Sequence, residues 1–359
     1  MSEKVKGRIL WWGRGDKKYS RNRIVLDFMN ELGFKVDFFH PRSSWFGKIE
    51  ALFSRIEKPD FLWVPCFRQS DVFSASFFAK KWKIPLVFDP LISAYQKEIF
   101  ERQKWPEQSF KAKRRKKWET KVFSNPDIIV CDTQAHANYF RQTFSVPEEK
   151  LSLLFVGAEE DVFLMNPSHK RKAKNSFEIL FYGSFIELQG AEYIGRAAKL
   201  ARDLPFKWVF VGEGPCLSKV KEETAGLGNV VFKPWMSYDE LCKQIFNADI
   251  LLGVFGDTSK ADMVIPNKVY QAMAAGKPVI TRMARAYDGN IAGSPVIGWV
   301  PKGDSQALFN KICKWLDKPE LLLERGAQTR QLFDGYFGTD KLLLMMETIF
   351  RGADKKQQA

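Results

Sequence analysis

The chain has 359 residues, 45% of them hydrophobic, and a formal net charge of +14 at pH 7. This length is enough for two domains with separate cores. The five cysteines form no C-x-x-C pair, which argues against a zinc site or a disulfide framework and fits a reducing compartment. No apolar run reaches the roughly 18 residues that span a bilayer, and no apolar signal core follows Met1, so we expect a cytoplasmic protein. The positive charge predicts an anionic partner, either a nucleic acid or the anionic leaflet of a membrane.

The chain begins with a predicted strand, a glycine loop and a helix. Arg8–Trp12 is an apolar run that leads into a loop with Gly13 and Gly15, and Arg23–Leu32 has the pattern of a helix. A second strand at Val36–Phe39 completes a βαβ unit. No G-x-G-x-x-G follows, so this loop is only weak evidence for a dinucleotide site.

An aromatic and aliphatic stripe comes next. Residues 43–53 (SSWFGKIEALF) place apolar side chains at spacings close to helical, namely Trp45, Phe46, Ile49, Leu52 and Phe53. Such a stripe is typical of a helix that faces the core, which is the favoured interpretation. With cations beside it, the same stripe is also typical of an amphipathic membrane anchor.

A carboxylate then follows a predicted buried strand. Phe61–Val64 and Leu86–Phe88 are predicted strands, with a helix at Asp71–Lys83 between them. Asp89 follows the second strand, and ligands of open α/β sheets bind at the carboxyl ends of strands. Asp89 is therefore either a site residue or a cap of the following segment.

Tyr95–Phe123 is predicted as one long basic helix. It contains six cations before Trp118, which are Lys111, Lys113, Arg114, Arg115, Lys116 and Lys117. This run is either a solvated helix face or a surface for anionic lipid head groups, at about 1 kcal/mol per cation. It lacks the interleaved aromatic residues and glycines of an RNA-binding sheet, so no nucleic-acid partner is predicted.

A polar segment separates the two halves of the chain. After strands at Asp127–Cys131 and Leu151–Phe155, residues 166–176 (NPSHKRKAKNS) are basic and have no apolar periodicity. We therefore predict one domain at 1–165, a linker at 166–176 and a second domain at 177–335. Residues 336–359 form a C-terminal helix whose polar tail, 351–359, is expected to fray.

The second half repeats the pattern of a strand followed by glycines. Phe177–Tyr182 leads to Gly183, and Trp208–Val211 leads to Gly212 and Gly214. Residues 248–282 then predict a strand, a polar loop, a helix that begins near Pro266, and another strand. Because helix N-termini at the carboxyl ends of strands favour anions, this loop, which also carries lysines, suits a diphosphate.

These segments carry a family resemblance. FYGSFIELQGAEYI at 181–194, VFVGEGP at 209–215, VVFKPW at 230–235 and a segment ending in Ala-Gly-Lys-Pro-Val-Ile stand in the order found in GT-B glycosyltransferases. In particular, the chain resembles their retaining family 4, the glycosyl transferases group 1. The resemblance implies an α/β GT-B fold, with two Rossmann-like domains whose parallel sheets face a central cleft. It also implies that the C-terminal helix returns to the N-terminal domain.

The chain departs from this family at its charged positions. Such enzymes commonly have Glu-x7-Glu where this chain has Met263 and Gln271, and an Arg and a Lys in the first loop where it has Ser184 and Gln189. We therefore predict that lysines from the loop and the helix supply the missing phosphate cations, and that Gln271 binds the ribose hydroxyls.

The resemblance implies a glycosyltransferase that moves a sugar from a nucleotide-sugar donor to an acceptor with retention of configuration. The predicted catalytic residues are Asp89, Lys260 and Lys268. The alternative for Lys268 is a solvent-exposed helix residue, in which case Lys260 or Arg282 is the predicted phosphate cation. The predicted donor-binding residues are Gly183, Ser184, Phe185, Gly212, Gly214, Trp235, Asn267 and Gln271. The predicted acceptor-side residues are Gly13, Gly15, Tyr19, Ser20 and Arg21. Trp235 either stacks on the nucleotide base or is a buried structural residue.

The expected partners follow from the same interpretation. A basic, aromatic-rich N-terminal domain favours a lipid-linked or cell-envelope glycan acceptor and a peripheral position on the inner face of the membrane. The donor is a substrate, and neither a cofactor nor a metal is expected, because no D-x-D ends a strand and no histidine is expected to cluster with carboxylates. The alternative is a non-catalytic nucleotide-sugar-binding or membrane-docking subunit, which Met263 and Gln271 favour.

Overall fold

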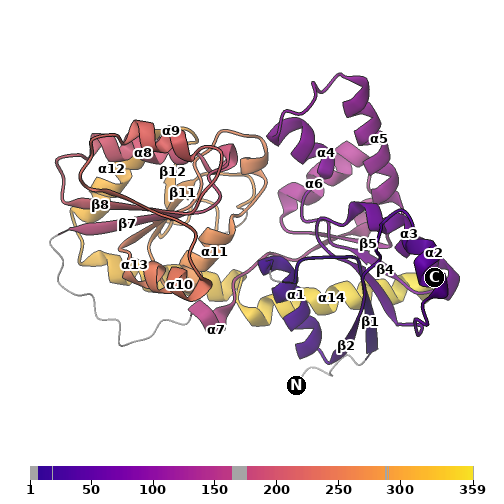
Figure 1. Ribbon diagram of the computed structural model, residues 1–359. Coiled ribbons are helices and arrows are strands. Elements are labelled where there is room, and N and C mark those ends of the chain that lie inside the picture. The colour runs from indigo at the N-terminus through magenta and orange to yellow at the C-terminus, as the bar shows by residue number, and fades with distance from the viewer. Residues whose placement is uncertain (1–6, 18, 164–175, 288, 290, 359) are drawn as a thin grey trace. The chain divides into compact units, whose positions relative to one another are not determined.

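The computed structural model describes residues 7–17, 19–163, 176–287, 289 and 291–358 (Figure 1). The chain forms two compact units, one from Met1–Val156 with Thr339–Ala359 and the other from Gly157–Gly338. The boundary therefore falls at 156/157, nine residues before the predicted one, and the predicted linker lies outside the described residues except for Ser176. Each unit contains a six-stranded parallel sheet with helices, so the predicted α/β class is confirmed.

The sheet of the first unit has the strand order β2-β1-β3-β4-β5-β6, and all neighbours are parallel. Its strands are β1 (Gly7–Trp12), β2 (Phe34–Phe39), β3 (Phe61–Val64), β4 (Leu86–Phe88), β5 (Ile128–Cys131) and β6 (Leu151–Leu153). Its helices are α1 (Ser20–Glu31), α2 (Gly47–Phe53), α3 (Val72–Trp82), α4 (Ala94–Gln96), α5 (Phe110–Ser124), α6 (Gln134–Phe144) and α14 (Thr339–Gln358). Short turns of 3-10 helix lie at Gln69–Asp71 and Glu148–Lys150.

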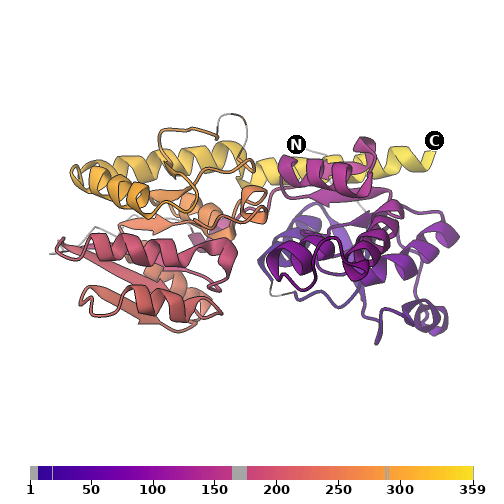
Figure 2. The same ribbon diagram turned by 90° about the horizontal axis from the view of Figure 1, so that it is seen from above.

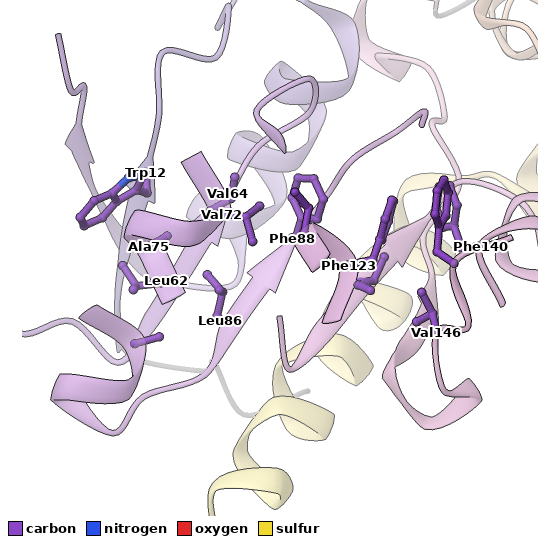
Figure 3. Close-up of a cluster of buried hydrophobic side chains, with 14 of the residues drawn as sticks. Trp12, Leu62, Val64, Val72, Ala75, Leu86, Phe88, Phe123, Phe140 and Val146 are labelled. Atoms are coloured by element: carbon purple, nitrogen blue, oxygen red, sulfur yellow. The ribbon is translucent and has the colours of Figure 1, made fainter. Parts of the chain in front are cut away.

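Both faces of this sheet are buried, which explains the continuous apolar runs in its strands. Successive side chains of a strand point to opposite faces, so Trp12 packs with α3, α5 and α6 on one face, whereas Trp11 packs with α1 and α14 on the other. Figure 3 shows part of the first cluster, in which Trp12, Phe88, Phe123 and Phe140 line up across the strands.

The C-terminal helix α14 belongs to the first unit. Leu342, Met346, Ile349 and Phe350 are buried in the same cluster as Trp11, and Figure 2 shows the yellow helix along this unit. The helix continues past 351 to Gln358 and Ala353 is completely buried, so fraying cannot begin at 351, and fraying of the polar residues after Ala353 stays a prediction.

Two other helix predictions are corrected in the first unit. The predicted helix Tyr95–Phe123 is broken into α4, a π-helical turn at Lys97–Glu101, and α5, because Gln103 has a φ of +46° and Pro106 follows. Residues 47–53 of the stripe form α2, with Trp45 and Phe46 in the turn before it, but the core interpretation is wrong. The helix buries Gly47 and Ala51 instead of its large apolar side chains.

The second unit has the strand order β12-β11-β10-β7-β8-β9, again with parallel neighbours. Its strands are β7 (Phe177–Tyr182), β8 (Phe206–Val211), β9 (Val230–Lys233), β10 (Ile250–Leu252), β11 (Val279–Arg282) and β12 (Gly298–Val300). Its helices are α7 (Glu160–Phe163), α8 (Ala191–Leu200), α9 (Leu217–Glu223), α10 (Tyr238–Asn247), α11 (Asn267–Ala274), α12 (Ser305–Leu316) and α13 (Leu321–Tyr336). Turns of 3-10 helix lie at Glu187–Gln189 and Lys260–Asp262. Within the described part of the chain, no helix is long and apolar enough to cross a membrane.

Candidate functional site

The strand order of the second unit places a ligand-binding edge where the sequence predicted one. The chain runs from β7 outward through β8 and β9, then continues on the other side of β7 with β10, β11 and β12. The topological switch point therefore lies between β7 and β10, and ligands of such sheets bind outside the carboxyl ends of the strands there. The loop that begins at Gly183 and the N-terminus of α11 flank this point.

Glycines allow the loops at this edge to touch through their backbones. Gly214 has a φ of +155°, and a Cβ on it would lie 1.8 Å from the carbonyl oxygen of Ser184. A Cβ on Gly212 would lie 2.1 Å from the carbonyl oxygen of Gly183. The loop after β8 thus supports the loop after β7, and any larger residue at Gly212 or Gly214 would displace it.

Lys268 lies in the first turn of α11 and points into this edge. Its side chain is only 6% exposed, and its Nζ lies 3.8 Å from the centroid of the Phe181 ring. A Cβ added to Gly183 would lie 2.9 Å from this Nζ and 2.6 Å from Oε1 of Gln189. Nζ and Oε1 are both buried, and neither has a hydrogen-bond partner within the described ranges. The alternative of a solvent-exposed helix residue is therefore wrong for Lys268.

Burial sets the charge state of this lysine. Desolvation lowers the pKa of Lys268 well below its usual value, because the ammonium has lost its water without gaining a carboxylate. An anion bound above Gly183 would supply the missing charge, and the helix N-terminus would add free N–H groups. A diphosphate is the group that this cradle suits.

The other predicted cations of the second unit have different surroundings. Lys260 begins a 3-10 turn, is 8% exposed and takes part in an interaction of its own, so it is not a free cation. Arg282 donates to Oδ1 of Asp262 at 3.1 Å and to the carbonyl oxygen of Gly256 at 2.8 Å, and Arg285 binds the same aspartate. These bonds tie the loop before α11 to β11. Lys268 is therefore better placed than Arg282 to meet a phosphate.

Gln271, one turn after Lys268, has partners at both ends of its amide. Its Oε1 accepts a hydrogen bond from the Tyr182 hydroxyl at 2.8 Å, and its Nε2 donates to the Tyr238 hydroxyl at 3.3 Å. The Tyr238 hydroxyl in turn donates to Oε2 of Glu159 at 2.7 Å. Ribose binding by Gln271 stays a prediction. To bind a ribose, the amide would have to give up its hydrogen bonds to the two tyrosines or make further ones beside them.

The remaining predicted donor residues differ in exposure. Phe185 is fully buried against Phe181 and Phe210, so its side chain is not available to a ligand, and donor contact through its backbone stays a prediction. Ser184 accepts a 3.4 Å hydrogen bond from Gln189, and Asn267 is the first residue of α11. Trp235 is 55% exposed after β9, which excludes the buried structural role but leaves base stacking untested.

The first unit has a polar cluster of its own at the carboxyl edge of its sheet. Arg21, from α1, donates through Nε to Oδ2 of Asp89, after β4, at 2.7 Å, and both side chains are almost fully buried. Nη1 of Arg21 also donates to the carbonyl oxygens of Leu154 and Phe155, at 2.9 and 2.7 Å. The sequence predicted both residues without pairing them. Burial raises the pKa of Asp89 despite the opposing effect of Arg21.

The other predicted acceptor-side residues lie in the loop after β1 and at the start of α1. Tyr19 packs its ring 5.2 Å from that of Phe67, and Ser20 begins α1. A Cβ on Gly13 would lie 2.9 Å from Oδ2 of Asp71, and one on Gly15 would lie 2.9 Å from Cγ of Pro65. These glycines let the loop after β1 pack on the loop after β3. Contact of any of these residues with an acceptor stays a prediction.

The comparisons with known proteins agree with this geometry. Residues 176–318 match the family model "Glycosyl transferases group 1". The structure of Anabaena Alr3699/HepE in complex with UDP superposes with a TM-score of 0.72, covering 96% of this chain and 99% of that one at 14% identity. Sucrose-phosphate synthase (tll1590) from Thermosynechococcus elongatus superposes with a TM-score of 0.71, covering 96% and 98% at 14% identity. This chain has the GT-B fold.

A further relative is similar over a shorter stretch. The putative colanic acid biosynthesis glycosyl transferase WcaI of Escherichia coli (strain K12) is 36% identical over 112 residues, which are 30% of this chain. The match spans only 27% of the length of that relative. The predicted resemblance to GT-B glycosyltransferases is confirmed by the family match and the two superpositions.

Within this GT-B fold, several polar residues were missed from the sequence. Asp132 follows β5, and His136 on α6 contacts its carboxylate through Nδ1, with both side chains buried. The expectation that no histidine clusters with carboxylates is therefore wrong for His136, although the described residues contain no group of three metal-ligating side chains. Glu159, Tyr182 and Tyr238 were also missed. Of these three, only Tyr182 has a sequence signal for a site, which is its position at the end of a predicted strand next to the glycine loop.

Proposed function

We propose that the protein is a glycosyltransferase whose second unit binds a nucleotide-sugar donor. The observation that carries this proposal is the buried Nζ of Lys268 over Gly183, at the N-terminus of α11, which has no hydrogen-bond partner among the described residues. A buried amine that gains a proton beside an anion, together with free helix N–H groups, favours a diphosphate at this position. The family match of this region supports the proposal, as do the similar structures that hold UDP or UDP-glucose.

The proposed reaction proceeds with retention of configuration. The sugar's bond to the diphosphate breaks, the acceptor oxygen forms the new bond on the same face, and the leaving diphosphate takes the acceptor's proton. Charge grows on the β-phosphate, and Lys268 is the group that we assign to oppose it. In this scheme the donor is a substrate, and neither a metal nor a cofactor is required.

We further propose that the acceptor is a lipid-linked or cell-envelope glycan. The basic N-terminal half favours an acceptor at an anionic surface, and the similar protein WcaI is named for colanic acid biosynthesis. The protein would then work in the cytoplasm, at the inner face of the membrane. Asp89 is proposed to act near the transferred sugar, with Arg21 holding its carboxylate.

A second candidate function is a non-catalytic nucleotide-sugar-binding or membrane-docking subunit. The observation that favours it is that neither Met263 nor Gln271 offers a carboxylate, and that the Gln271 amide is already bonded to two tyrosines. Such a subunit would bind the donor and leave it intact.

A ligand screen followed by product analysis tests both candidates. Nucleoside diphosphates and their sugars are added singly, and thermal unfolding is recorded. A ligand at 100 times its dissociation constant should stabilise the folded state by about 2.7 kcal/mol. The stabilising sugar donor is then incubated with lipid-linked and free glycan acceptors, and the anomeric configuration of the product is read by NMR. Stabilisation without turnover would favour the subunit, and an absence of stabilisation by every nucleotide would contradict both candidates.

A further inference from the structure

The outer side of α2 and the turn before it carry large apolar side chains that are exposed in the described part of this unit. Trp45 is 89% exposed and Phe53 is 87% exposed, and Phe46, Ile49 and Leu52 are each at least half exposed. Only the small residues Gly47 and Ala51 of the helix face the unit. Contiguous exposed apolar groups of this size mark interaction sites, because monomeric soluble proteins rarely leave so much apolar surface in water.

The exposed apolar groups continue onto the neighbouring helices. Phe73 and Phe77, one turn apart on α3, are 40% and 37% exposed. Nζ of Lys48 on α2 lies 3.7 Å from the centroid of the Phe77 ring, and the Phe73 ring lies 6.4 Å from that of Trp118 on α5. Figure 1 shows α2 and α3 side by side in this unit. We call Trp45, Phe46, Ile49, Leu52, Phe53, Phe73 and Phe77 the aromatic surface.

Cations surround the aromatic surface. The exposed cations on α2 and α3, or within a few residues of them in sequence, are Arg42, Lys48, Arg55, Lys80 and Lys81. On α5, Lys111, Arg114 and Lys121 are exposed and share a helix face with Trp118, by spacings of three and four. The acidic residues between Arg42 and Lys58 have partners, because Glu50 accepts from the backbone N–H of Arg42 and Glu57 contacts Arg8.

We infer that the aromatic surface enters the head-group region of an anionic membrane, with the surrounding lysines and arginines on the lipid head groups. Amphipathic elements that lie in a bilayer interface combine Trp, Phe and Leu with a rim rich in Lys and Arg. Protein–protein interfaces are depleted of lysine, which disfavours a protein partner here. The inference deepens the proposed function and rests on it, because a lipid-linked acceptor would be reached at the membrane surface. Binding itself needs no donor and no reaction.

Vesicle flotation of the full-length protein without nucleotide tests the inference. The vesicles contain phosphatidylcholine alone or equal parts of phosphatidylcholine and phosphatidylglycerol. The protein should float with the anionic vesicles at low salt, and the fraction bound should fall as the salt concentration is raised, because surface charges are screened over about 10 Å at 0.1 M. The double variant Trp45→Ser/Phe53→Ser should bind about 10-fold less or weaker still, since two large aromatic groups no longer leave water.

Matched controls separate lipid insertion from general stickiness. Leu323 and Leu344 are 73% and 59% exposed and lie on α13 and α14, away from the aromatic surface in sequence and element. Leu323→Ser/Leu344→Ser should bind vesicles like the wild type. All of the substituted side chains are exposed, so unchanged thermal unfolding confirms that each variant folds. Equal binding of wild type and Trp45→Ser/Phe53→Ser would overturn the inference.

Two further outcomes would also overturn it. Self-association in analytical ultracentrifugation that Trp45→Ser/Phe53→Ser abolishes, without vesicle binding by the wild type, would assign the aromatic surface to a second copy of the chain. Equal binding to neutral and anionic vesicles would remove the role of the cations. Because nucleotide binding is measured separately by thermal unfolding, failure of the membrane inference and failure of the proposed function can be distinguished.

Discussion

Lys268 is an unusual residue because the folded protein keeps its amine buried above Gly183 without a partner among the described residues. Its pKa is lowered by desolvation, so in a window below about 10.4 the unfolded chain holds a proton that the folded protein lacks. Stability should therefore rise with pH across that window. Lys268→Met should remove this slope and raise the free energy of unfolding at neutral pH. Urea titrations at several pH values measure both quantities, and an unchanged slope would contradict the assignment.

The same residue should matter more for turnover than for binding. If Lys268 opposes charge that grows on the leaving diphosphate, Lys268→Met should lower kcat by about 100-fold or more while donor affinity falls less. Donor binding should also take up a proton at neutral pH, because a diphosphate next to Nζ raises the lysine's pKa. Calorimetry in buffers of different ionisation enthalpy detects this uptake. Equal losses in kcat and affinity would make Lys268 a ground-state clamp, and full activity would remove it from the site.

Gln271 stands where the glycosyltransferases that the sequence resembles commonly have a glutamate, and the contacts of its amide predict that a glutamate would destabilise this protein. Glu159 already accepts from Tyr238, so Gln271→Glu would place a second carboxylate on the same hydroxyl. We expect a loss of about 1–3 kcal/mol in the free energy of unfolding at neutral pH. The loss should shrink at low pH, because repulsion raises the pKa of the pair and protonation relieves it. Urea denaturation at pH 5 and pH 8 tests this.

A double variant provides the control for this prediction. Glu159→Gln/Gln271→Glu moves the single carboxylate from one side of Tyr238 to the other and should recover most of the stability lost in Gln271→Glu. Gln271→Ala should weaken the binding of a free nucleotide if the amide also reaches the ribose. An unchanged affinity in Gln271→Ala would confine the residue to its two tyrosine contacts.

At the scale of single elements, α14 shows how a helix distant in sequence completes a core. Phe350 is 1% exposed, and its ring centroid lies 4.4 Å from that of Phe34 and 5.1 Å from that of Phe61. Phe350→Ala should lower the free energy of unfolding by about 3–5 kcal/mol through the cavity that it leaves. Leu344→Ala, on the exposed side of the same helix, should change it by less than about 0.5 kcal/mol. Urea denaturation measures both changes. If Phe350→Ala lowered the free energy of unfolding as little as Leu344→Ala is expected to, α14 would contribute no core packing.

At the scale of the whole molecule, all the residues that we assign to the nucleoside diphosphate part of the donor belong to one unit. Bound nucleoside diphosphate should therefore slow hydrogen exchange at the backbone amides of 183–185 and of the first turn of α11. Amides of the buried strands β1 and β4 should exchange as in the free protein, because the first unit contributes nothing to the proposed diphosphate contacts. Mass spectrometry of exchanged peptides resolves the two sets. Protection at residues 13–16 in place of 183–185 would move the nucleotide to the first unit.

The local features of this protein could be predicted from its sequence alone. Alternating strands and helices follow from periodicity, and the glycines after β7 and β8 follow from the backbone conformations that those loops require. The position of Lys268 in the first turn of α11 follows from the Pro266 start signal. These features depend on neighbours within a few residues, which is why a single sequence carries them.

Burial and pairing were decided only by the tertiary structure. Nothing near Arg21 in sequence indicates that it pairs with Asp89, and nothing near Gln271 indicates that Tyr182 and Tyr238 bond its amide. The periodicity of α2 shows which side of the helix is apolar, but not whether another element covers it. The sheet order brings residues from distant segments to one edge, and whether an apolar stripe faces the core depends on the surface that the rest of the chain has left open.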